Sequence, residues 1–447
     1  DLFIRPRPPA RCASGPSWAV DAVAPTGATT TMSAIAPTWA ASRRGDVWTI
    51  VVRALEIASK TDRPLRRSAE EPWGLGRIDA TGSRATRGVP PRRATRSSGR
   101  RDNAAVTPLA DELRGAVGSS HVLVGDVAAG FEQDWTGRFG GPAQAVVRPA
   151  DRTEIESVLS ICRQAQVPVI PQGGNTGLVG GSVPRPTPSG GDGPVVLSTA
   201  RLTAIGALDQ TTGQITVEAG VTLAALQSVV RNSGWRFAVD LGARDRATIG
   251  GMIATNAGGL HVVAHGMMRR QVLGLEAVLP SGRLLRHLAG LTKDNTGYDL
   301  GGLLCGSEGT LAVITAARLR LIPEPSERVV ALLGLASVDD AVALSGRLRR
   351  CDGIEAIEVF GPTEAELAAT HGDLDHPFRP WPPVLVLAEV TGSDPATSLS
   401  DAVVGDDTVT DVAVATTPAA RRNLWAIREL ITDALLPLGP GLKLDVT

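Results

Sequence analysis

The sequence predicts an α+β protein with two domains, and three observations support this. From about Thr107, short apolar runs alternate with amphipathic segments, as is typical of β-α-β units. Pro323 and Pro325 follow a long apolar run, and proline neither donates to a strand ladder nor favours a helical predecessor. Beyond them, the order of strands and helices suggests a ferredoxin-like layer. We expect a leader over 1–103, a first domain over 104–325 and a second domain over 326–447.

The first domain contains a clear helical pattern near its start. Ile155, Val158, Leu159 and Ile161 recur at helical spacing, so they would share one buried face. The compact apolar run that follows indicates a buried strand. The domain is expected to contain helices over 109–117, 154–166 and 223–233 and strands over 145–148, 167–171, 195–198, 214–218, 272–279 and 310–321.

The second domain is expected to open with a strand soon after the prolines. Its predicted strands cover 329–335, 354–360 and 384–390, and its predicted helices cover 339–350 and about 419–436. Because the chain reaches Thr447 soon after the last helix, we expect a ferredoxin-like layer whose second half is incomplete.

The charge of the chain is informative only when it is divided along the sequence. The 447 residues carry 45 Lys and Arg against 46 Asp and Glu, which argues against a general nucleic-acid or membrane-surface binder. Residues 1–100 alone hold 16 Arg and one Lys against eight acidic residues, so the remainder is acidic. No apolar run approaches the roughly 18 residues that a membrane span needs. With 43% hydrophobic residues, the chain can bury a sizeable core.

The leader over 1–103 is rich in Arg, Pro, Ser, Thr and Ala, a composition typical of disordered or non-native sequence. Only the run 47–58 shows helical periodicity. A basic arm that binds nucleic acid is an alternative, although the arginines are scattered and lack interleaved aromatic residues. A misread upstream reading frame would produce a similar composition.

The cysteines indicate a reducing compartment. Cys12, Cys162, Cys305 and Cys351 lie far apart and form no CxxC or Cys/His cluster. A disulfide framework or a structural zinc site is therefore not expected, and the cytoplasm is the predicted location. The chain starts at Asp1 without a signal-peptide pattern, so we expect a processed or incomplete chain.

The most informative stretch is a glycine-rich loop that directly follows a predicted strand. It reads PQGGNTGLVGGS over 171–182. Its glycines let successive backbone amides turn toward an anion such as a pyrophosphate, and Asn175, Thr176 and Ser182 add hydrogen-bonding groups. The spacing is neither GxGxxG nor GxxxxGK[ST], so neither a Rossmann fold nor a P-loop is predicted. A flexible loop without a ligand is the alternative.

Two further clusters follow in the chain. The segment 248–259 reads TIGGMIATNAGG, and its small residues suit a backbone that lies flat against a large planar ligand. Tight packing between two backbones would select the same residues. The third cluster comprises KDNTGYDL over 293–300 and GSEGTL over 306–311. Each cluster alone is compatible with more than one role, whereas the three clusters in this order indicate one kind of protein.

These motifs make the chain similar to the FAD-linked D-2-hydroxyacid dehydrogenases of the vanillyl-alcohol-oxidase superfamily. That family includes D-2-hydroxyglutarate dehydrogenase, D-lactate dehydrogenase and the flavin subunit of glycolate oxidase. The resemblance covers about residues 106–447, and also rests on VLGLEAVLPSG over 272–282 and GSEGTLAVIT over 306–315. It implies a two-lobed FAD-binding domain of the p-cresol-methylhydroxylase type, followed by a cap domain that holds the substrate. The second domain would be this cap domain.

The resemblance also implies which residues hold the cofactor. The pyrophosphate loop would start at the end of the preceding strand, and the other two clusters would line the isoalloxazine ring. FAD is expected to be non-covalent, because neither cluster offers a histidine, and Cys162 and Cys305 lie outside the expected attachment positions. The expected FAD-binding residues are Pro171, Gln172, Gly173, Gly174, Asn175, Thr176, Gly177, Gly181, Ser182, Gly250, Gly251, Thr255, Asn256, Gly259, Glu308, Gly309, Thr310 and Ile314.

In the cap domain, the resemblance assigns the substrate carboxylate to Arg428, Thr432 and Lys443. Arg428 and Thr432 are four residues apart and would share a helix face. Arginine offers a planar two-pronged donor to a carboxylate, and lysine a compact second charge. A solvated helix arginine is the alternative for Arg428.

The family's metal-binding histidines and catalytic base are expected beyond Thr447, so no catalytic or metal-binding residue is assigned. The histidines at 121, 261, 265, 287, 371 and 376 form no matching pair, and the run over 371–376 is interpreted as a solvated loop. The sequence AHGMMRR over 264–270 differs from the ArgTyrGly-type segment that is usual in the family.

The predicted function is oxidation of a D-2-hydroxyacid, of the 2-hydroxyglutarate or lactate type, to the 2-oxoacid by hydride transfer to flavin N5. Electrons would leave to an acceptor other than NAD, no nucleic-acid partner is expected, and a homodimer is compatible with the sequence. One alternative is an FAD-binding fragment that lacks the metal and base. Another is an ether-lipid or cell-wall enzyme on the same FAD domain.

Overall fold

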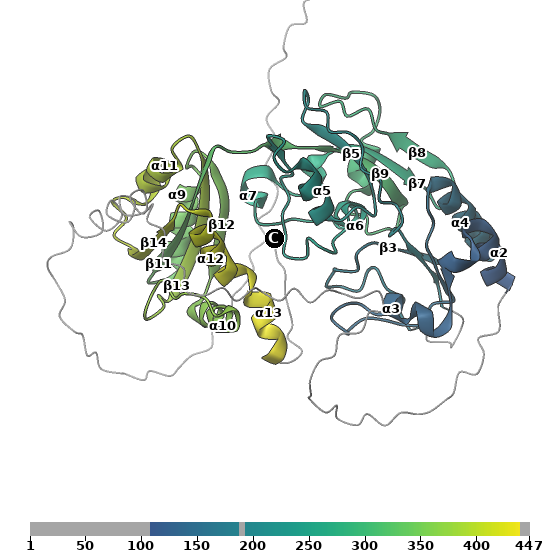
Figure 1. The fold of residues 1–447 in the computed structure, drawn as a ribbon, viewed down its shortest axis with the longest axis horizontal. Helices are drawn as coiled ribbons and strands as arrows, with labels where there is room; N and C mark the ends of the chain where they lie inside the picture. The colour runs from purple at the N-terminus through teal and green to yellow at the C-terminus, as the bar shows by residue number, and fades with distance from the viewer. Residues whose placement is uncertain (1–107, 187–192, 439–447) are drawn as a thin grey trace, which may run out of the picture. The chain divides into compact units, whose positions relative to one another are not determined.

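The computed structural model describes residues 108–186 and 193–438 (Figure 1). The leader, the run 47–58 and Lys443 lie outside the described residues. The described parts of both domains belong to one compact unit. Within these residues, no helix combines the length and apolar character that a membrane crossing requires.

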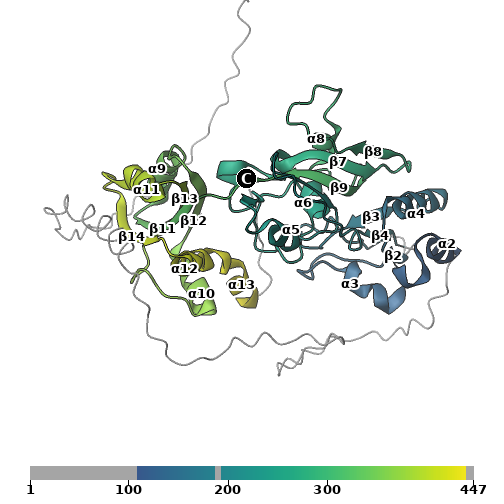
Figure 2. The same ribbon diagram turned by 45° about the horizontal axis from the view of Figure 1, so that its top comes forward.

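The first lobe of the first domain is a four-stranded sheet. Its strand order is β1-β2-β4-β3, with β2, β4 and β3 parallel and β1 antiparallel to β2. Helices α2 and α4 lie beside this sheet, as Figures 1 and 2 both show. The elements are α2 (Pro108–Val117), η1 (Ser119–His121), β1 (Val122–Leu123), η2 (Gly125–Ala128), α3 (Ala129–Glu132), β2 (Ala145–Val147), α4 (Arg152–Gln164), β3 (Val169–Gln172) and β4 (Val195–Ser198).

The sequence explains α4 in detail. Asp151 precedes the helix and its carboxylate accepts hydrogen bonds from the amides of Thr153 and Glu154, which are otherwise unpaired at a helix start. Ile155 and Val158 are fully buried on its inner face, as their spacing predicts.

The second lobe is an antiparallel sheet in the order β5-β9-β7-β8. One hydrophobic core joins it to the first lobe, because Val195 and Leu197 of β4 belong to the same buried cluster as Ile215 of β5 and Leu319 of β9. Its elements are β5 (Gln214–Glu218), α5 (Leu223–Val230), α6 (Ile249–Ala254), α7 (Val262–His265), η3 (Met268–Gln271), β7 (Val272–Val278), β8 (Leu284–His287), α8 (Leu300–Leu304) and β9 (Val313–Arg320), with a small ribbon of β6 (Trp235–Arg236) and β10 (Ile322–Pro323).

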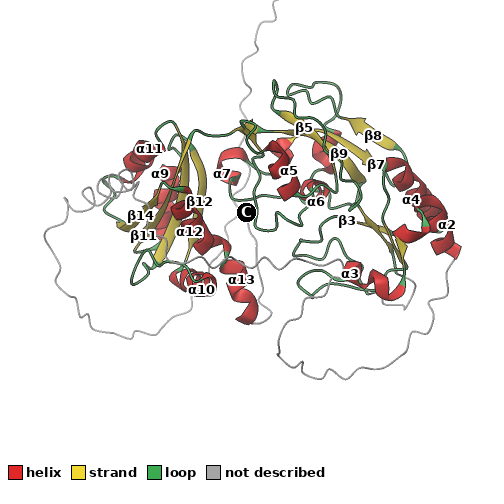
Figure 3. Cartoon of the chain, viewed as in Figure 1, coloured by secondary structure: helices red, strands yellow, loops and turns green. Residues whose placement is uncertain are grey.

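The cap domain is one antiparallel sheet in the order β12-β13-β11-β14, with helices on both faces (Figure 3). Helices α9 and α11 cover one face, and α10 and α12 cover the other. The elements are β11 (Glu327–Leu335), α9 (Val338–Leu348), β12 (Ile354–Phe360), α10 (Pro362–Gly372), β13 (Val384–Gly392), α11 (Pro395–Val403), β14 (Val409–Ala415), α12 (Pro418–Glu429), α13 (Ile431–Leu435) and η4 (Leu436–Leu438).

The α+β fold class is confirmed, with one correction. Each central strand of the cap sheet separates two strands that a helix connects, which is the ferredoxin-like arrangement. The sheet was expected to be incomplete, but β14 (Val409–Ala415) supplies its fourth strand. The sequence analysis missed β14 because Thr410 and Asp411 interrupt the apolar pattern near the start of this short strand.

A second correction concerns the expected helix over 419–436. The structure divides it into α12, which ends at Glu429, and α13, which begins at Ile431. Arg428 and Thr432 therefore lie on different short helices, not on one continuous face.

Candidate functional site

The first two glycine clusters pack directly against each other. A Cβ atom at Gly173 would collide with Oγ1 of Thr248, and one at Gly174 would collide with the carbonyl oxygen of Arg246. Thr248 is also the N-cap of α6, where its hydroxyl accepts from the amide of Gly251. Packing against the Thr248 side chain and the Arg246 backbone therefore requires glycine at 173 and 174, without any ligand.

The third cluster closes against the other two. The amide of Glu308 donates to the carbonyl of Ala254 at 2.8 Å, and the amide of Gly306 donates to that of Ile253 at 3.0 Å. A Cβ at Gly309 would lie 3.1 Å from the ring of Pro171, so this segment also touches the first loop. Three motifs that are spread over more than a hundred residues of sequence thus meet at one place in the fold.

Side chains hold the first loop in shape. Asn175 has a left-handed backbone with φ of 52°, donates to the carbonyl of Gln133 at 2.8 Å and accepts from Ser182 Oγ at 2.7 Å. Buried Gln172 donates to the carbonyls of Phe131 at 2.9 Å and Ser182 at 2.8 Å. The polar residues of this motif therefore shape the loop before any ligand is considered.

The backbone amides of the loop remain available. In the described part of the chain, none of the N–H groups from Gly173 to Gly177 donates to a protein acceptor. Adjacent unpaired amides in a loop are the donors that bind pyrophosphate in proteins. Gly177 also faces open space, since nothing lies within 4 Å of a Cβ placed there. The loop therefore fits the pyrophosphate of FAD.

The segment expected beside the flavin ring packs tightly at several of its glycines. A Cβ at Gly250 would approach Ala219 to 2.6 Å, and one at Gly259 would collide with the carbonyl of Asp240. Backbone packing therefore explains Gly250 and Gly259. The hydroxyl of Thr255 donates to the carbonyl of Gly251 at 3.1 Å, which fixes it against α6.

Asn256 and Arg269 connect this segment to the third cluster. Oδ1 of Asn256 accepts from the amide of Arg269 at 2.9 Å, and the guanidinium of Arg269 donates to the carbonyls of Gly302 and Cys305. Burial raises the pKa of the Cys305 thiol, whose Sγ lies 3.6 Å from Oδ1 of Asn256. The thiol is thus a neutral neighbour of the site.

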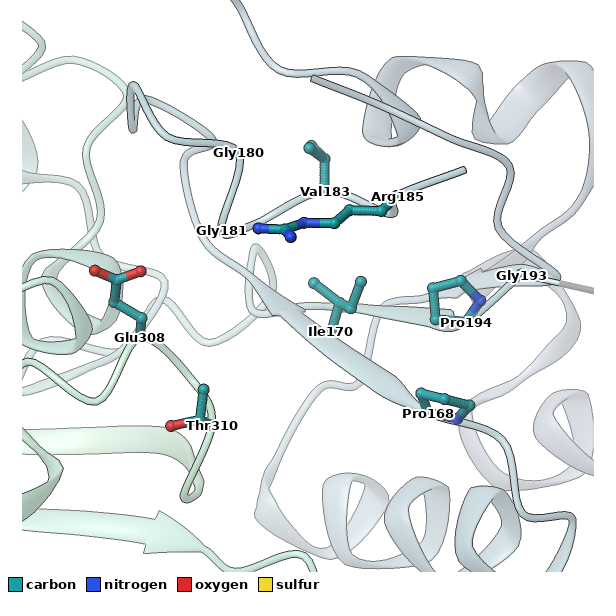
Figure 4. A pocket seen from close by; sticks show the side chains of 10 residues that line it. All are labelled: Pro168, Ile170, Gly180, Gly181, Val183, Arg185, Gly193, Pro194, Glu308 and Thr310. Atoms are coloured by element: carbon teal, nitrogen blue, oxygen red, sulfur yellow. The ribbon is translucent and has the colours of Figure 1, made fainter. Parts of the chain in front are cut away.

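A cleft of about 450 Å³ opens where the first and third clusters meet. Gly181 and Glu308 face each other across it, and a Cβ at Gly181 would lie 3.2 Å from Glu308 Oε2. The side chain of Arg185 extends into the same cleft (Figure 4). Ile314, another of the expected FAD-binding residues, belongs to the hydrophobic core and is 7% exposed. The lining residues are Pro168, Ile170, Gly180, Gly181, Val183, Arg185, Gly193, Pro194, Glu308 and Thr310.

Arg428 is not a freely solvated arginine. Its Nε donates to Oε2 of Glu358 at 2.7 Å, and its side chain is 32% exposed. This bond uses only Nε. Among the described residues, none bonds to the two terminal nitrogens of the guanidinium, so both nitrogens can donate to a substrate carboxylate. Thr432 is partly buried on α13, and Lys443 lies outside the described residues.

The neighbour of Arg428 ties the cap to the glycine clusters. Glu429 forms an ion pair of 3.1 Å with Arg244, which also pairs with Asp240 at 3.1 Å. Arg244 belongs to the loop whose Arg246 packs against Gly174. Arg428 therefore directly precedes a residue, Glu429, that contacts the loop packed against the first glycine motif.

The described residues do not fit the metal that the resemblance implies. None of their His, Cys, Asp and Glu side chains form a group of three that could hold a metal ion. The run over 371–376 is not simply a solvated loop: His371 lies in the last turn of α10, and His376 contacts Trp381 and lies 3.5 Å from Glu366.

Several contributing residues were missed from the sequence. Thr248 and Glu358 lie inside recognised stretches, and the position of Thr248 before a helix could have indicated a capping role. Trp135, whose Nε1 donates to the carbonyls of Thr176 and Gly177 at 3.1 Å, has no local pattern that reveals this contact. Arg244 and Arg269 act through partners distant in sequence.

Comparison with protein families agrees with this architecture. Residues 143–287 match the FAD binding domain, and residues 324–447 match the C-terminal domain of FAD linked oxidases. The chain is 37% identical over 323 residues to the mitochondrial D-2-hydroxyglutarate dehydrogenase of Bos taurus, covering 70% of this chain and 58% of that protein. It is 35% identical over 318 residues to the D-2-hydroxyglutarate dehydrogenase of Xanthomonas citri pv. viticola, covering 69% and 65%.

A provisionally named mitochondrial D-lactate dehydrogenase of Schizosaccharomyces pombe is 34% identical over 326 residues, covering 71% of this chain and 61% of that protein. The chain thus spans about three fifths of the length of these relatives.

Solved structures show the same fold at low identity. An alkyldihydroxyacetonephosphate synthase matches with a TM-score of 0.61 and 19% identity, covering 74% of this chain and 65% of that one. p-Cresol methylhydroxylase with substrate bound matches with a TM-score of 0.58 and 16% identity, covering 73% and 71%. The chain therefore contains regions similar to the two domains of FAD linked oxidases, and it is similar in sequence to the D-2-hydroxyglutarate and D-lactate dehydrogenases.

Proposed function

We propose that this chain is an FAD-dependent dehydrogenase that oxidises a D-2-hydroxyacid to the corresponding 2-oxoacid. Its homology to enzymes named for this chemistry supports the reaction class. The observation that carries the proposal most directly is the chain of contacts from Arg428 to the first glycine motif, through Glu429, Arg244 and the loop that packs against Gly174. A carboxylate bound at Arg428 would thereby be presented to the domain that holds the cofactor.

The chain's own residues would bind and orient the two reactants. The unpaired amides over Gly173–Gly177 would hold the pyrophosphate of FAD, and the terminal nitrogens of Arg428 would hold the substrate carboxylate in a two-pronged contact. Glu358 would restrict the rotation of the Arg428 guanidinium, which favours a reactive pose. Bound FAD would supply the two-electron acceptor, taking a hydride from the substrate Cα at N5.

The proton of the substrate hydroxyl would pass to a base. The two electrons would then pass to an acceptor other than NAD. The identity of this acceptor and the formation of a homodimer stay predictions. A reducing location also stays a prediction, and the free thiols of Cys162, Cys305 and Cys351 support it.

A spectroscopic experiment tests the proposed reaction. The purified chain, loaded with FAD, is mixed without oxygen with D-2-hydroxyglutarate, D-lactate or glycolate, and the visible absorbance of the flavin is followed. Bleaching by one of these acids is expected, because hydride transfer reduces the flavin. A yellow protein that none of them bleaches would instead support an FAD-binding chain without turnover. A folded chain that binds no FAD would contradict both.

Arg428→Ala tests the carboxylate assignment. The Michaelis constant for the bleaching acid is expected to rise by about 10- to 100-fold, because a hydrogen bond to a charged group contributes roughly 1.5–3 kcal/mol. Arg422→Ala is the matched control, since Arg422 is an exposed arginine on the same helix. Equal Michaelis constants in the two variants would remove Arg428 from the site.

A further inference from the structure

A buried carboxylate connects the cap domain to the first domain. Glu355 lies on β12 and is only 5% exposed. It accepts from Nη2 of Arg236 at 2.6 Å and pairs with Nε2 of His265 at 2.9 Å, and both partners belong to the first domain. Thr391 on the adjacent strand of the cap donates to it at 3.1 Å. The carboxylate therefore has its two charge-bearing partners, Arg236 and His265, only when the two domains are in contact.

The backbone of the cap is shaped to present this side chain. In the ladder between β12 and β13, Ile354 pairs with Val390 and Ala356 pairs with Glu389, so Glu355 is an additional residue at a β-bulge. A bulge re-aims the side chain at its position. Gly353 makes the local turn with φ of 79°, and a Cβ there would collide with the carbonyl of Thr391.

The same strand also holds the substrate-binding candidate. Glu358 follows Glu355 by three residues, which corresponds to roughly 10 Å along a strand. Glu358 accepts from Arg428 Nε at 2.7 Å. A single strand thus joins the interdomain contact at Glu355 to the guanidinium of Arg428.

His265, the first-domain partner of Glu355, lies close in sequence to the segment 248–259 that is expected beside the flavin ring. His265 is the last residue of α7, which begins three residues after Gly259. The side-chain Nε2 of Gln271 donates to the carbonyl of His265 at 2.8 Å, and so fixes the end of this helix. Movement of His265 would therefore be transmitted to the segment expected beside the isoalloxazine ring.

We propose that Glu355 is a positioning residue: its bonds to Arg236 and His265 set where Arg428 lies relative to the flavin. The proposal rests on the proposed function. A buried charge pair contributes little net stability compared with an apolar contact, but loss of one partner leaves the other buried and uncompensated. Such a contact therefore specifies the relative placement of two surfaces more than it stabilises either domain.

Glu355→Gln is the test, because it keeps the shape and removes the charge. Asp406→Asn is the matched control: the Asp406 carboxylate of the cap is also largely shielded, with 9% of its side chain exposed, but it pairs within the cap with Arg347. Glu355→Gln is expected to lower kcat/KM by roughly 10- to 100-fold, as for a small misplacement of reactants. FAD affinity is expected to stay unchanged, and Asp406→Asn is expected to lower only the melting temperature.

A readout without turnover keeps this proposal separate from the proposed reaction. In the FAD-loaded chain, amide hydrogen exchange over 261–266 is expected to become faster in Glu355→Gln and to stay as in the unmodified chain in Asp406→Asn. If no hydroxyacid is oxidised, this exchange result alone decides the proposal.

His265→Gln completes a cycle with Glu355→Gln. If the two residues act as one contact, the double variant is expected to lose no more kcat/KM than the more impaired single variant. Exchange that is unchanged in Glu355→Gln, or kcat/KM equal to that of Asp406→Asn, would overturn the proposal.

Discussion

Individual glycines of the first motif have different surroundings although they look alike in the sequence. Gly174 lies against the carbonyl of Arg246, where no Cβ fits, whereas Gly177 faces open space. Gly174 is therefore required for folding, and Gly177 is available to a ligand. The sequence could predict that this motif binds a pyrophosphate but could not separate these two roles, because the contact to Arg246 spans more than seventy residues.

A pair of variants separates the two roles. Gly174→Ala is expected to lower the free energy of unfolding by about 1–3 kcal/mol, as overpacking does. Gly177→Ala is expected to leave the melting temperature of the FAD-free chain unchanged, yet to weaken FAD binding by roughly tenfold, because its Cβ would occupy the open space next to the bound pyrophosphate. Calorimetry and titration of flavin fluorescence measure these quantities. Unchanged FAD affinity in Gly177→Ala would place the pyrophosphate elsewhere.

At the scale of single elements, the sequence predicted most strands and helices of the first domain to within three residues of their observed bounds. Their apolar periodicity is a local property, so it can be read without the fold. The short helices α6, α7 and α8 were missed because they lie in glycine-rich stretches, where propensity is low and packing decides. The break between α12 and α13 was missed because amphipathic spacing continues across Leu430.

The N-cap of α4 offers a test at this scale. Asp151→Ala removes the acceptor for the amides of Thr153 and Glu154 and is expected to reduce the free energy of unfolding by about 1 kcal/mol. Asp111→Ala, which breaks an exposed ion pair with Arg114, is expected to have a smaller effect. Urea unfolding of both variants provides the comparison, and equal losses would contradict the capping role.

At the scale of the whole molecule, ionised side chains join the two domains. Burial by itself would raise the pKa of Glu355, but the hydrogen bond from His265 and the charge of Arg236 outweigh it and lower the pKa to about 2. Partial burial lowers the pKa of the nearby His261 and favours the neutral ring. The domain contact therefore requires an ionised Glu355.

This arrangement predicts a pH dependence of stability. Above the ordinary pKa of 4.5, Glu355 is ionised in the folded and unfolded chain, and its full contribution is present. As the pH falls from 4.5 toward 2, the unfolded chain takes up the proton first, so roughly 3 kcal/mol of stability is lost. Urea unfolding across this range should therefore show a steeper loss in the unmodified chain than in Glu355→Gln. Parallel curves would contradict the assignment.

The sequence by itself determined the cofactor class, the resemblance to FAD-linked dehydrogenases and the order of the three glycine motifs, because these depend on residue types at short spacings. Only the tertiary structure decided which glycines pack and which remain open, that Glu358 holds Arg428, and that Glu355 joins the domains. The physical reason is that these contacts depend on a one-residue bulge and on partners that lie far apart in the chain. No local pattern of residues records either feature.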